Sequence, residues 1–259
     1  MNYGICHIPI IPCRGDTSEK SELVTQILFG EKYEVIEEKK DWIRIKTLWD
    51  HYTGWINISQ LFFTSKPGKK DMQPPYFLSK DIYSRIIETG TDQSMYIPMG
   101  SRLNFINDDL LSIENKTWIF KGNFTESIHP KGGGAMVQAA LLYLNSPYLW
   151  GGRSPMGIDC SALIQMAAIF CGINMPRDAS MQVLQGSTVQ GLQNSMAGDI
   201  AFFHNDQGAI IHTGILTGNG YIIHASGYVR INKIDENGIL INDCNTYSHR
   251  LAEIKRYTN

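Results

Sequence analysis

Cys160 stands where a glycine-rich loop meets an apolar segment, and it is the first candidate nucleophile of the chain. Residues 148–159 form the loop. Residues 161–171 are apolar almost all round and are followed by Gly172, a pattern that predicts a buried helix with a glycine cap. Asp159 holds the N-cap position, which places Cys160 in the first turn. The unpaired backbone N–H groups and the helix dipole there are expected to lower the pKa of the thiol. The alternative is that Cys160 is a small buried core residue.

Two histidines on one predicted hairpin supply a candidate base and its partner. His212 and His224 lie in two apolar runs that are separated by the turn sequence Thr-Gly-Asn-Gly at 217–220. If the turn is centred on Gly218, the two histidines stand directly opposite each other on one face of the sheet, within hydrogen-bond reach. One would take the thiol proton and the other would hold the first in its tautomer. A zinc site made by Cys160, His212 and His224 uses the same residue types and stays open as a rival.

The other cysteines and histidines follow no such pattern. The five cysteines are scattered and contain no CxxC pair, so neither a disulfide framework nor a zinc knuckle is expected. Cys171 and Cys244 are interpreted as packing residues. The leading interpretation includes no metal and no cofactor. The remaining histidines are interpreted as surface residues; they are His7, His51, His129, His204 and His249.

The composition is that of an ordinary globular chain. With 259 residues, of which 43% are hydrophobic and 19% charged, the chain is long enough for two or three domains with real cores. The net charge of −2 gives no reason to expect nucleic acid or an anionic membrane as a partner, and no apolar run is long enough to span a bilayer. The first residues lack the basic start and apolar core of a signal peptide. The expected location is therefore the cytoplasm, or the periplasm or cell exterior if a signal has been removed.

Short strands separated by turns fill the first half of the chain. Strand-like runs at 23–29, 33–37, 42–47 and 54–58 predict a small SH3-like barrel over residues 1–65. The polar, proline-bearing residues 66–75 predict a linker. Residues 76–130 predict a second, less regular β module of the same kind.

Residues 131–259 are predicted to form the third domain and to carry the chemistry. Helical spacing of apolar residues runs to about Asn145, the Cys160 helix follows, and a short helix is expected from Asp178 to Gln185. From Asp199 onward the segment is rich in strands. Helices followed by strands predict the α+β class.

Several motifs in this third domain resemble those of the NlpC-type papain-like cysteine peptidases, which cleave bacterial cell-wall peptides. With two SH3-like modules before this domain, the whole chain is similar to the γ-D-glutamyl-L-diamino acid endopeptidases of that family. The resemblance implies a papain-like catalytic domain and a murein peptide as substrate. The motifs occur in the family's order and are Tyr148-x-Trp-Gly-Gly, Asp159-Cys160-Ser161, Pro176-Arg-Asp-Ala179, Ala197-Gly-Asp-Ile-Ala-Phe-Phe203, His212-Thr-Gly and His224-Ala-Ser.

The resemblance also implies a role for each catalytic residue. Cys160 would attack the γ-carbonyl of D-glutamate, His212 would act as base and then as acid, and His224 would orient His212. The Cys160 backbone N–H and the Tyr148 hydroxyl would stabilise the oxyanion, each good donor contributing roughly 3 kcal/mol. Hydrolysis would release L-Ala-D-Glu.

A pocket for a free N-terminal L-alanine is implied as well, because the substrates of this group begin with that residue. Asp178 matches the family position that contacts the ammonium, and Glu22 and Tyr52 from the first module are its expected companions. Asp159 and Ser161 complete the expected substrate-binding set. The first module would then act as a gate against peptides whose N-terminus is still attached to glycan. Asp178 can equally be a helix N-cap, and Glu22 a solvated charge at a strand edge.

Other functions stay open at this point. An amidase that acts on the lactyl–alanine bond would use the same cysteine and histidine on a related fold. A protein that binds murein peptides without cleaving them would use the SH3-like modules and an inactive third domain. In each case the expected partner is a murein peptide, with no nucleic acid and no membrane span, and the chain is expected to be a monomer. The loop at Trp150 is expected to shape the wall of the cleft, and Asp199 to serve a tight turn.

Overall fold

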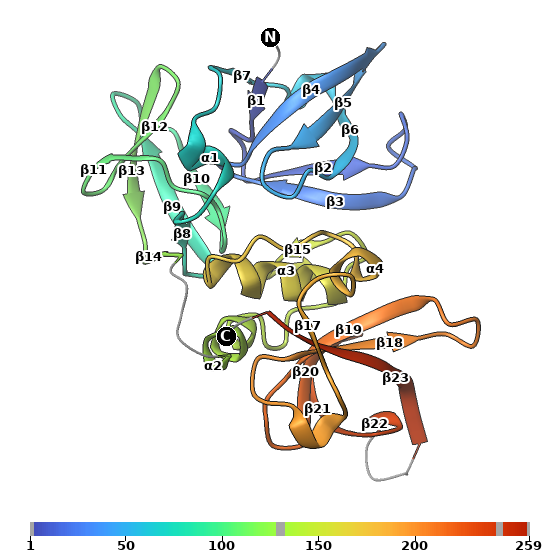
Figure 1. The fold of residues 1–259 in the computed structure, drawn as a ribbon. Helices are drawn as coiled ribbons and strands as arrows, with labels where there is room; N and C mark the ends of the chain where they lie inside the picture. The colour runs from blue at the N-terminus through green and yellow to red at the C-terminus, as the bar shows by residue number, and fades with distance from the viewer. Residues whose placement is uncertain (1–2, 128–132, 242–245, 258–259) are drawn as a thin grey trace. The chain divides into compact units, whose positions relative to one another are not determined.

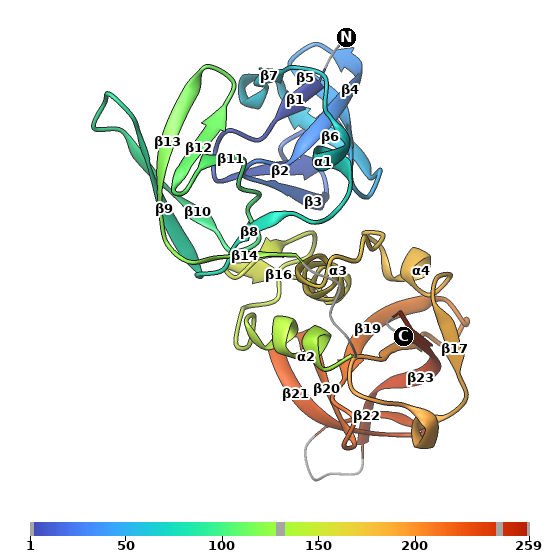
Figure 2. The ribbon, with the colours of Figure 1, turned by 60° about the vertical axis from the view of Figure 1, so that its left-hand side comes forward.

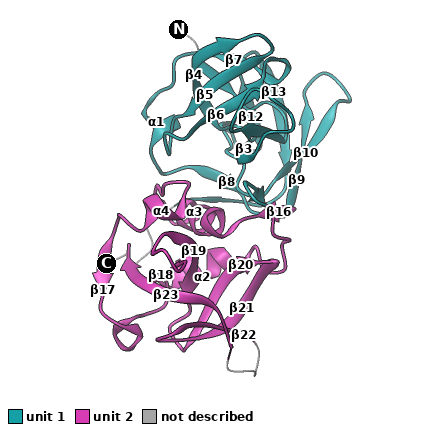
Figure 3. Cartoon of the chain, turned by 90° about the vertical axis from the view of Figure 1, so that its right-hand side faces the viewer, with its two compact units in different colours: residues 1–128, 150–155 teal, residues 129–149, 156–259 magenta. Residues whose placement is uncertain are grey.

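The computed structural model describes residues 3–127, 133–241 and 246–257, and it divides the chain into two compact units (Figure 1). Unit 1 comprises residues 1–128 and 150–155, and unit 2 comprises residues 129–149 and 156–259 (Figure 3). Residues 150–155, which the sequence assigned to the third domain, thus belong with the N-terminal unit. No helix in the described part of the chain is both long enough and apolar enough to cross a membrane.

Unit 1 begins with a seven-stranded antiparallel sheet in the order β3-β2-β6-β5-β4-β1-β7. Alternate residues of its strands point inward; along β5, for example, Ile43, Ile45 and Thr47 are buried. Strands are present in all four runs predicted between residues 23 and 58. The bounds are β1 (Tyr3–Ile5), β2 (Ile10–Arg14), β3 (Leu23–Leu28), β4 (Lys32–Lys39), β5 (Trp42–Thr47), β6 (Thr53–Asn57), the 3₁₀ turn η1 (Ile58–Gln60) and β7 (Phe63–Thr64).

A second, five-stranded sheet in unit 1 has the order β10-β9-β13-β12-β11 (Figure 2). Its buried residues, which include Ile86, Ile97 and Trp118, share one hydrophobic cluster with Ile5 and Phe29 of the first part of the chain. The two predicted modules therefore pack as one unit. The bounds are β9 (Tyr83–Glu88), β10 (Ser94–Pro98), β11 (Phe105–Asn107), β12 (Leu110–Ile113) and β13 (Lys116–Lys121), with β8 (Phe77–Ser79) and β14 (Phe124–Glu126) paired separately.

The predicted linker, residues 66–75, takes part in this packing. It contains the short helix α1 (Lys69–Met72), and Asp71 is buried with one carboxylate oxygen 2.9 Å from the Lys32 ammonium. The Arg102 guanidinium donates a hydrogen bond to the Asp71 backbone carbonyl. Contacts of this kind are needed because an unpaired buried polar group costs about 1–3 kcal/mol. The segment is thus bound to both halves of unit 1.

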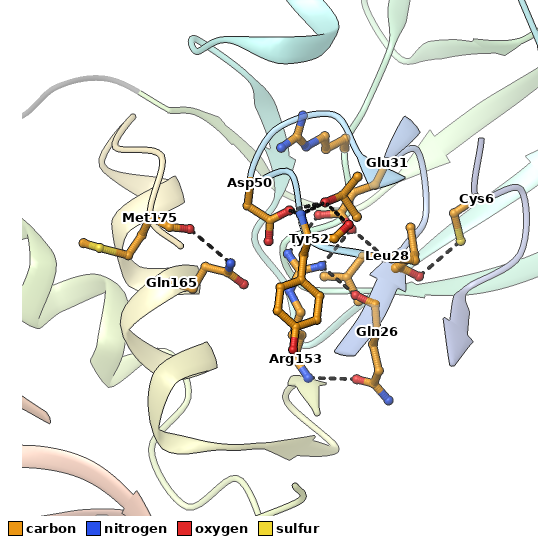
Figure 4. Close-up of polar contacts among 12 residues, drawn as sticks. Cys6, Gln26, Leu28, Glu31, Asp50, Tyr52, Arg153, Gln165 and Met175 are labelled. Carbon is orange, nitrogen blue, oxygen red and sulfur yellow. Dashed lines mark hydrogen bonds and ion pairs between the residues drawn. The ribbon is translucent and has the colours of Figure 1, made fainter. Parts of the chain in front are cut away.

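Residues 150–155 are anchored in unit 1 by a buried ion pair. Arg153 donates from Nη1 and Nη2 to the two carboxylate oxygens of Glu31, at 2.8 and 2.9 Å (Figure 4). Arg153 also donates its backbone N–H to the Gln26 side chain. Gly151 has a φ of 76°, and a Cβ there would lie 2.0 Å from the Leu23 carbonyl oxygen, so only glycine fits. The short strand β15 (Arg153–Ser154) forms at this point.

Unit 2 is built on a seven-stranded sheet in the order β17-β23-β18-β19-β20-β21-β22. Because β22 also pairs with β23, the six strands β18 to β23 close into a barrel. Strands predominate over helices in the described part of the chain. The bounds are β16 (Gly157–Ile158), β17 (Ser187–Val189), the 3₁₀ turn η2 (Leu192–Asn194), β18 (Ile200–His204), β19 (Ile210–Leu216), β20 (Tyr221–Ser226), β21 (Tyr228–Asp235), β22 (Gly238–Ile241) and β23 (Thr246–Arg256).

The described helices of unit 2 precede its barrel in the chain, as predicted. α2 (Gly134–Leu141) and α3 (Cys160–Phe170) pack against each other and against β19 and β20 (Figure 2). α2 ends before the predicted Asn145, whose φ of 68° is not helical. α3 ends at Phe170, and the predicted glycine cap follows it: Gly172 has a φ of 68° and donates its N–H back to the helix. α4 (Ala179–Gln182) is a single turn.

The described cysteines are free thiols: Cys6, Cys13, Cys160 and Cys171. Cys171 is buried at the end of α3, which confirms its interpretation as a packing residue. Cys244 and His129 lie outside the described residues.

Candidate active site

Cys160 is the first residue of α3, where the sequence placed it. The Asp159 carboxylate accepts a hydrogen bond at 2.8 Å from a backbone N–H of the first turn and caps the helix. Cys160 is buried, with only 7% of the residue exposed. Backbone hydrogen bonds from Thr213 and Ser161 reach its sulfur. Because Thr213 follows His212 on β19, the thiol lies beside the strand that carries the first histidine.

The thiol of Cys160 is hard to ionise in the free protein. Burial, with a smaller contribution from the Asp159 carboxylate, raises the pKa of Cys160 to about 12. The hydrogen bonds from Thr213 and Ser161 lower that pKa, but by less. The expectation that the helix N-terminus lowers the thiol pKa is therefore wrong for the free protein, because taking a thiolate out of water outweighs the local N–H groups.

Arg177 holds the Asp159 side chain, and sequence reasoning missed this role. Its buried guanidinium donates to both oxygens of Asp159, at 3.0 and 2.5 Å, and to the Ser161 hydroxyl at 2.9 Å. Asp159 and Ser161, which were predicted to bind substrate, are thus engaged in buried bonds that fix the turn around Cys160. Arg177 stood within the quoted motif at 176–179, but its partner lies 18 residues earlier in the chain.

His212 and His224 meet, although in a different register from the predicted one. Nε2 of His212 lies 2.9 Å from Nδ1 of His224. The predicted register is wrong by two residues, since His224 faces Gly214. A two-residue shift keeps both side chains on the same face of the sheet, so the two histidine rings are still in contact. The shift arises because the turn extends to Tyr221, whose carbonyl accepts hydrogen bonds from both the N–H and the hydroxyl of Thr217.

Gly214 makes room for this diagonal contact. A Cβ at Gly214 would lie 2.9 Å from the Cβ of His224 and 2.7 Å from the Ile222 side chain. Real side chains do not approach so closely, so a residue other than glycine would push His224 away. The glycine therefore lets the His224 ring lean across the strand pair towards His212.

Asn232 on β21 completes a directed chain of hydrogen bonds. Its Nδ2 donates to the Leu240 carbonyl at 3.3 Å, and its Oδ1 lies 3.1 Å from Nε2 of His224. An amide oxygen can only accept, so His224 carries its proton on Nε2 and accepts at Nδ1 from Nε2–H of His212. His212 is then left with an unprotonated Nδ1, which is what a general base needs. No sequence signal pointed to Asn232, because its contact depends on the pairing of β20 with β21.

His249 stacks on His212, which makes its interpretation as a surface residue wrong. The two ring centroids are 3.9 Å apart and the ring planes are inclined by 21°. Burial is the main cause that lowers the pKa of His212 well below its usual value and that of His224 to about 4; His249 and Arg230 act in the same direction. Both histidines are therefore neutral at pH 7.

Tyr148 is half-buried, and its phenol is close enough to Cys160 for the charge of the Cys160 thiolate to affect the pKa of Tyr148. Its backbone N–H donates to the Gly227 carbonyl at 2.9 Å. Burial, followed by the charges of Cys160 and Asp159, raises the pKa of Tyr148 to about 12. The phenol is therefore protonated at neutral pH and can donate a hydrogen bond.

The other predicted binding residues fall in different parts of the chain. Asp178 is the N-cap residue of α4, but its side chain makes no capping hydrogen bond. Glu22 and Tyr52 belong to unit 1. The exposed Glu22 accepts a hydrogen bond at 2.6 Å from Nε1 of Trp150, and the half-buried Tyr52 donates its backbone N–H to Asp50.

Asp199 serves the tight turn that was predicted, because its side chain accepts the Met196 N–H at 2.8 Å and its own N–H donates to the Met196 carbonyl. It is buried, and both of its oxygens also accept hydrogen bonds from Arg256. Over residues 3–127, 133–241 and 246–257, no group of three or more His, Cys, Asp or Glu side chains is arranged to hold a metal ion.

Comparison with known protein families gives two matches. The NlpC/P60 family matches residues 145–246, and the bacterial dipeptidyl-peptidase SH3 domain matches residues 15–61. The chain carries an NlpC/P60 domain preceded by an SH3 domain. The second predicted SH3-like module, residues 76–130, stays a prediction.

Curated relatives share most of this arrangement. The chain is 26% identical over 226 residues to γ-D-glutamyl-L-lysine dipeptidyl-peptidase of Bacillus cereus, covering 79% of this chain and 68% of the relative. It is 28% identical to dipeptidyl-peptidase 6 of Lysinibacillus sphaericus, covering 83% and 86%. The crystal structure of a NlpC/P60 family protein from Bacillus cereus superposes with a TM-score of 0.82 at 20% identity, over 99% of this chain and 100% of that one, a likeness of fold. Together, the NlpC/P60 domain and the named relatives identify a cysteine peptidase that acts on peptidoglycan.

Proposed function

We propose that this chain is a γ-D-glutamyl-L-diamino acid endopeptidase, which cleaves murein peptides that have a free N-terminal L-alanine and releases L-Ala-D-Glu. Relatives from Bacillus cereus and Bacillus subtilis are named for action at the γ-D-glutamyl-L-lysine bond. The observation that carries the catalytic part of the proposal is the directed chain from Asn232 through His224 to His212. That chain leaves Nδ1 of His212 available for a thiol proton.

In the proposed reaction, Cys160 is the nucleophile. As its sulfur attacks the γ-carbonyl carbon of D-glutamate, the thiol proton passes to Nδ1 of His212 and the carbonyl electrons move onto oxygen. The Cys160 backbone N–H and the Tyr148 hydroxyl donate to that oxyanion. His212 then protonates the departing amine of the diamino acid, which leaves a thioester. Water, deprotonated by His212, then attacks the thioester carbon; the C–S bond breaks, the Cys160 sulfur takes the proton back from His212, and L-Ala-D-Glu is released.

The residues around this trio hold it in place. His224 and Asn232 accept the hydrogen bonds that keep His212 in one tautomer and stabilise the imidazolium that forms. Asp159, Arg177 and Ser161 fix the first turn of α3, and with it the Cys160 N–H. The neutral thiol and the neutral imidazole imply that the proton moves only when substrate is bound.

We assign recognition of the free N-terminus to Asp178, with Glu22 and Tyr52 as its companions. The ammonium of L-alanine needs an anionic setting, and two of these three side chains are carboxylates. On this proposal residues 1–65 act as a gate, and residues 76–130 form a second SH3-like module that supports the first. A peptide whose alanine nitrogen is acylated would be excluded.

The test is to incubate the protein with L-Ala-γ-D-Glu-diaminopimelate, with the same tripeptide carrying L-lysine, with the N-acetylated tripeptide and with intact murein, and to follow the products by mass spectrometry. We expect release of L-Ala-D-Glu from the free tripeptides and none with the Cys160→Ala variant. Cleavage of the acetylated peptide or of murein at the same rate would discard the gate and keep the peptidase. Cleavage at the lactyl–alanine bond would favour the amidase instead, and binding without any cleavage would favour a murein-peptide binding protein.

A further inference from the structure

A buried glutamine joins the helix that carries Cys160 to the segment that follows this helix. Gln182, on α4, is fully buried. Its Nε2 donates to the Ser161 carbonyl at 3.0 Å and to the Pro176 carbonyl at 2.8 Å. A side-chain amide nitrogen carries two N–H donors, so Gln182 uses both of them on these two carbonyls. Because Ser161 follows Cys160 in the first turn of α3, one of the two bonds reaches the turn of the nucleophile itself.

Residues 175–178, between α3 and α4, carry two side chains that serve the site. Arg177 holds the Asp159 side chain at the start of α3, and Asp178 is assigned above to the ammonium of the substrate. Gln182 contacts this segment twice, because its backbone N–H also donates to the Asp178 carbonyl at 2.9 Å. The same glutamine therefore fixes the backbone of both side chains relative to α3.

A second buried glutamine holds the same segment from the other helix. Gln165 lies on α3, is fully buried and donates from Nε2 to the Met175 carbonyl at 3.1 Å (Figure 4). Buried backbone carbonyls need such donors, since an unpaired one is costly. Amide side chains from α3 and α4 thus take the place that water has in an exposed loop.

Tyr257, which follows β23, fixes α4 in turn. Its hydroxyl donates to the backbone carbonyl of Gln182. α4 is a single helical turn, and a helix that short is not stable by itself, so its position depends on contacts of this kind. The backbone of Gln182 is therefore fixed by Tyr257, while its side chain is fixed on α3 and on residues 175–178.

The spacing that these bonds fix is the one that the acyl half of the substrate must span. In the proposed reaction the L-alanine ammonium pairs with Asp178 while the γ-carbonyl of D-glutamate lies at the Cys160 sulfur. The number of covalent bonds between these two groups is set, so the carboxylate and the sulfur must keep one separation. A displacement of about 1 Å at such a site lowers the rate on the order of a hundredfold.

We propose that Gln182 is a positioning residue for this reaction: it holds Asp178 at the separation from Cys160 that brings the γ-carbonyl of D-glutamate to the sulfur. The inference rests on the proposed function. Gln182 acts through the two segments that it joins and not on the substrate itself. Its loss should therefore alter the alignment of a bound peptide more than its affinity.

The test variant is Gln182→Met, which keeps the length of the side chain but has no N–H donor. On L-Ala-γ-D-Glu-diaminopimelate we expect kcat to fall at least about tenfold with KM within about threefold of the parent, because each segment still contacts its own part of the peptide. The second measurement needs no substrate. It is the rate at which iodoacetamide alkylates Cys160 at alkaline pH, followed by mass spectrometry. Cys160 is only 7% exposed, and a looser turn should raise this rate at least about threefold.

Two further variants separate positioning from stability. Leu192→Ala is the control for lost stability, because Leu192 packs against the barrel core and lies outside both segments. It should lower the melting temperature and leave kcat and the alkylation rate unchanged. Tyr257→Phe removes the bond to the Gln182 backbone and should lower kcat and raise the alkylation rate by about twofold.

A kcat in Gln182→Met that stays within about twofold of the parent, or an equal loss in Leu192→Ala, would overturn the proposal, since Gln182 would then contribute to stability alone. Where Gln182→Met does not fold, a parental kcat in Tyr257→Phe overturns it. If the parent protein leaves the tripeptide intact, the proposed function fails, and the alkylation rates decide separately whether Gln182 holds the Cys160 turn. Equal rates in the parent and in the variants would then show that it does not.

Discussion

The imidazole of His249 lies flat against that of His212, with 3.9 Å between ring centroids and 21° between ring planes. Phe203 contacts both rings, its centroid 5.7 Å from that of His212 and 6.0 Å from that of His249. His212 comes from β19 and His249 from β23, and β18, which carries Phe203, pairs with both strands and brings the two rings to the same face. The contact restricts rotation of the His212 ring and so keeps Nδ1 in one direction.

Loss of this stack should reduce turnover without weakening substrate binding. For His249→Ala we expect kcat to fall about tenfold, because an aromatic pair contributes roughly 0.5–1.5 kcal/mol and its loss frees the His212 ring. His249→Phe keeps a flat ring and should retain most of the activity. Steady-state kinetics on the free tripeptide measure both variants, with KM expected to stay within about twofold. Equal losses in the two variants would mean that the imidazole nitrogens of His249, and not its stacking, matter.

Replacement of Asn232 should reduce kcat, although Asn232 does not contact the thiol. Asn232→Ala leaves the Nε2–H of His224 without its acceptor, which costs about 1–3 kcal/mol and corresponds to a loss of roughly 5- to 150-fold in kcat. The readout is kcat on the tripeptide, with circular dichroism to verify folding. Asn219→Ala, in the exposed turn of the β19–β20 hairpin, is the matched control and should keep full activity. A wild-type kcat in Asn232→Ala would mean that His212 holds its tautomer without this chain.

Local sequence was enough to predict the part of the site that surrounds Cys160. The Asp159 cap, the position of Cys160 and the glycine cap at Gly172 are all decided within a dozen residues, by hydrogen bonds and φ angles that the residue types favour. The hairpin of His212 and His224 was also predictable, but not its register. Which residues face each other depends on the length of the turn, and the Thr217 side chain extends the turn by hydrogen bonding across it.

Sequence could not predict the partners that arrive from distant strands. Asn232 reaches His224 through the pairing of β20 with β21, and His249 reaches His212 because β18 pairs with both β19 and β23. The pKa of Cys160 was misjudged for a related reason. A helix N-terminus is visible in the sequence, whereas the packing of α3 against the barrel, which removes water from the thiol, is not.

Alkylation of Cys160 by iodoacetamide should be slow at neutral pH. Because burial raises the thiol pKa to about 12, the reactive thiolate is a small fraction at pH 7, and the rate should rise about tenfold per pH unit between pH 7 and 10. Mass spectrometry of the peptide that contains Cys160, in the free protein, measures this rate. Cys171, whose buried thiol has a pKa raised to about 11, serves as an internal reference that should also label slowly. A rate that is already constant below pH 7 would instead indicate a preformed thiolate–imidazolium pair.

Unit 2 should lose stability as the pH falls from 6.5 to 4, and His224 supplies a defined part of that loss. Burial is the main cause that lowers its pKa from 6.5 to about 4, while the hydrogen bond to Asn232 opposes the shift. Between these two values the unfolded chain binds a proton that the folded protein does not, so the free energy of unfolding rises with pH in this interval. The contribution present above pH 6.5 and lost by pH 4 is about 3 kcal/mol, and the lowered pKa values of His212 and His249 act in the same direction.

Urea unfolding at pH 7.0, 5.5 and 4.5 measures the slope. His224→Gln should flatten it by close to one proton, while His51→Gln in the exposed turn of unit 1 controls for the substitution itself. If His224→Gln keeps the full slope, His224 is already protonated in the folded protein, and the neutral chain from Asn232 to His212 does not describe it.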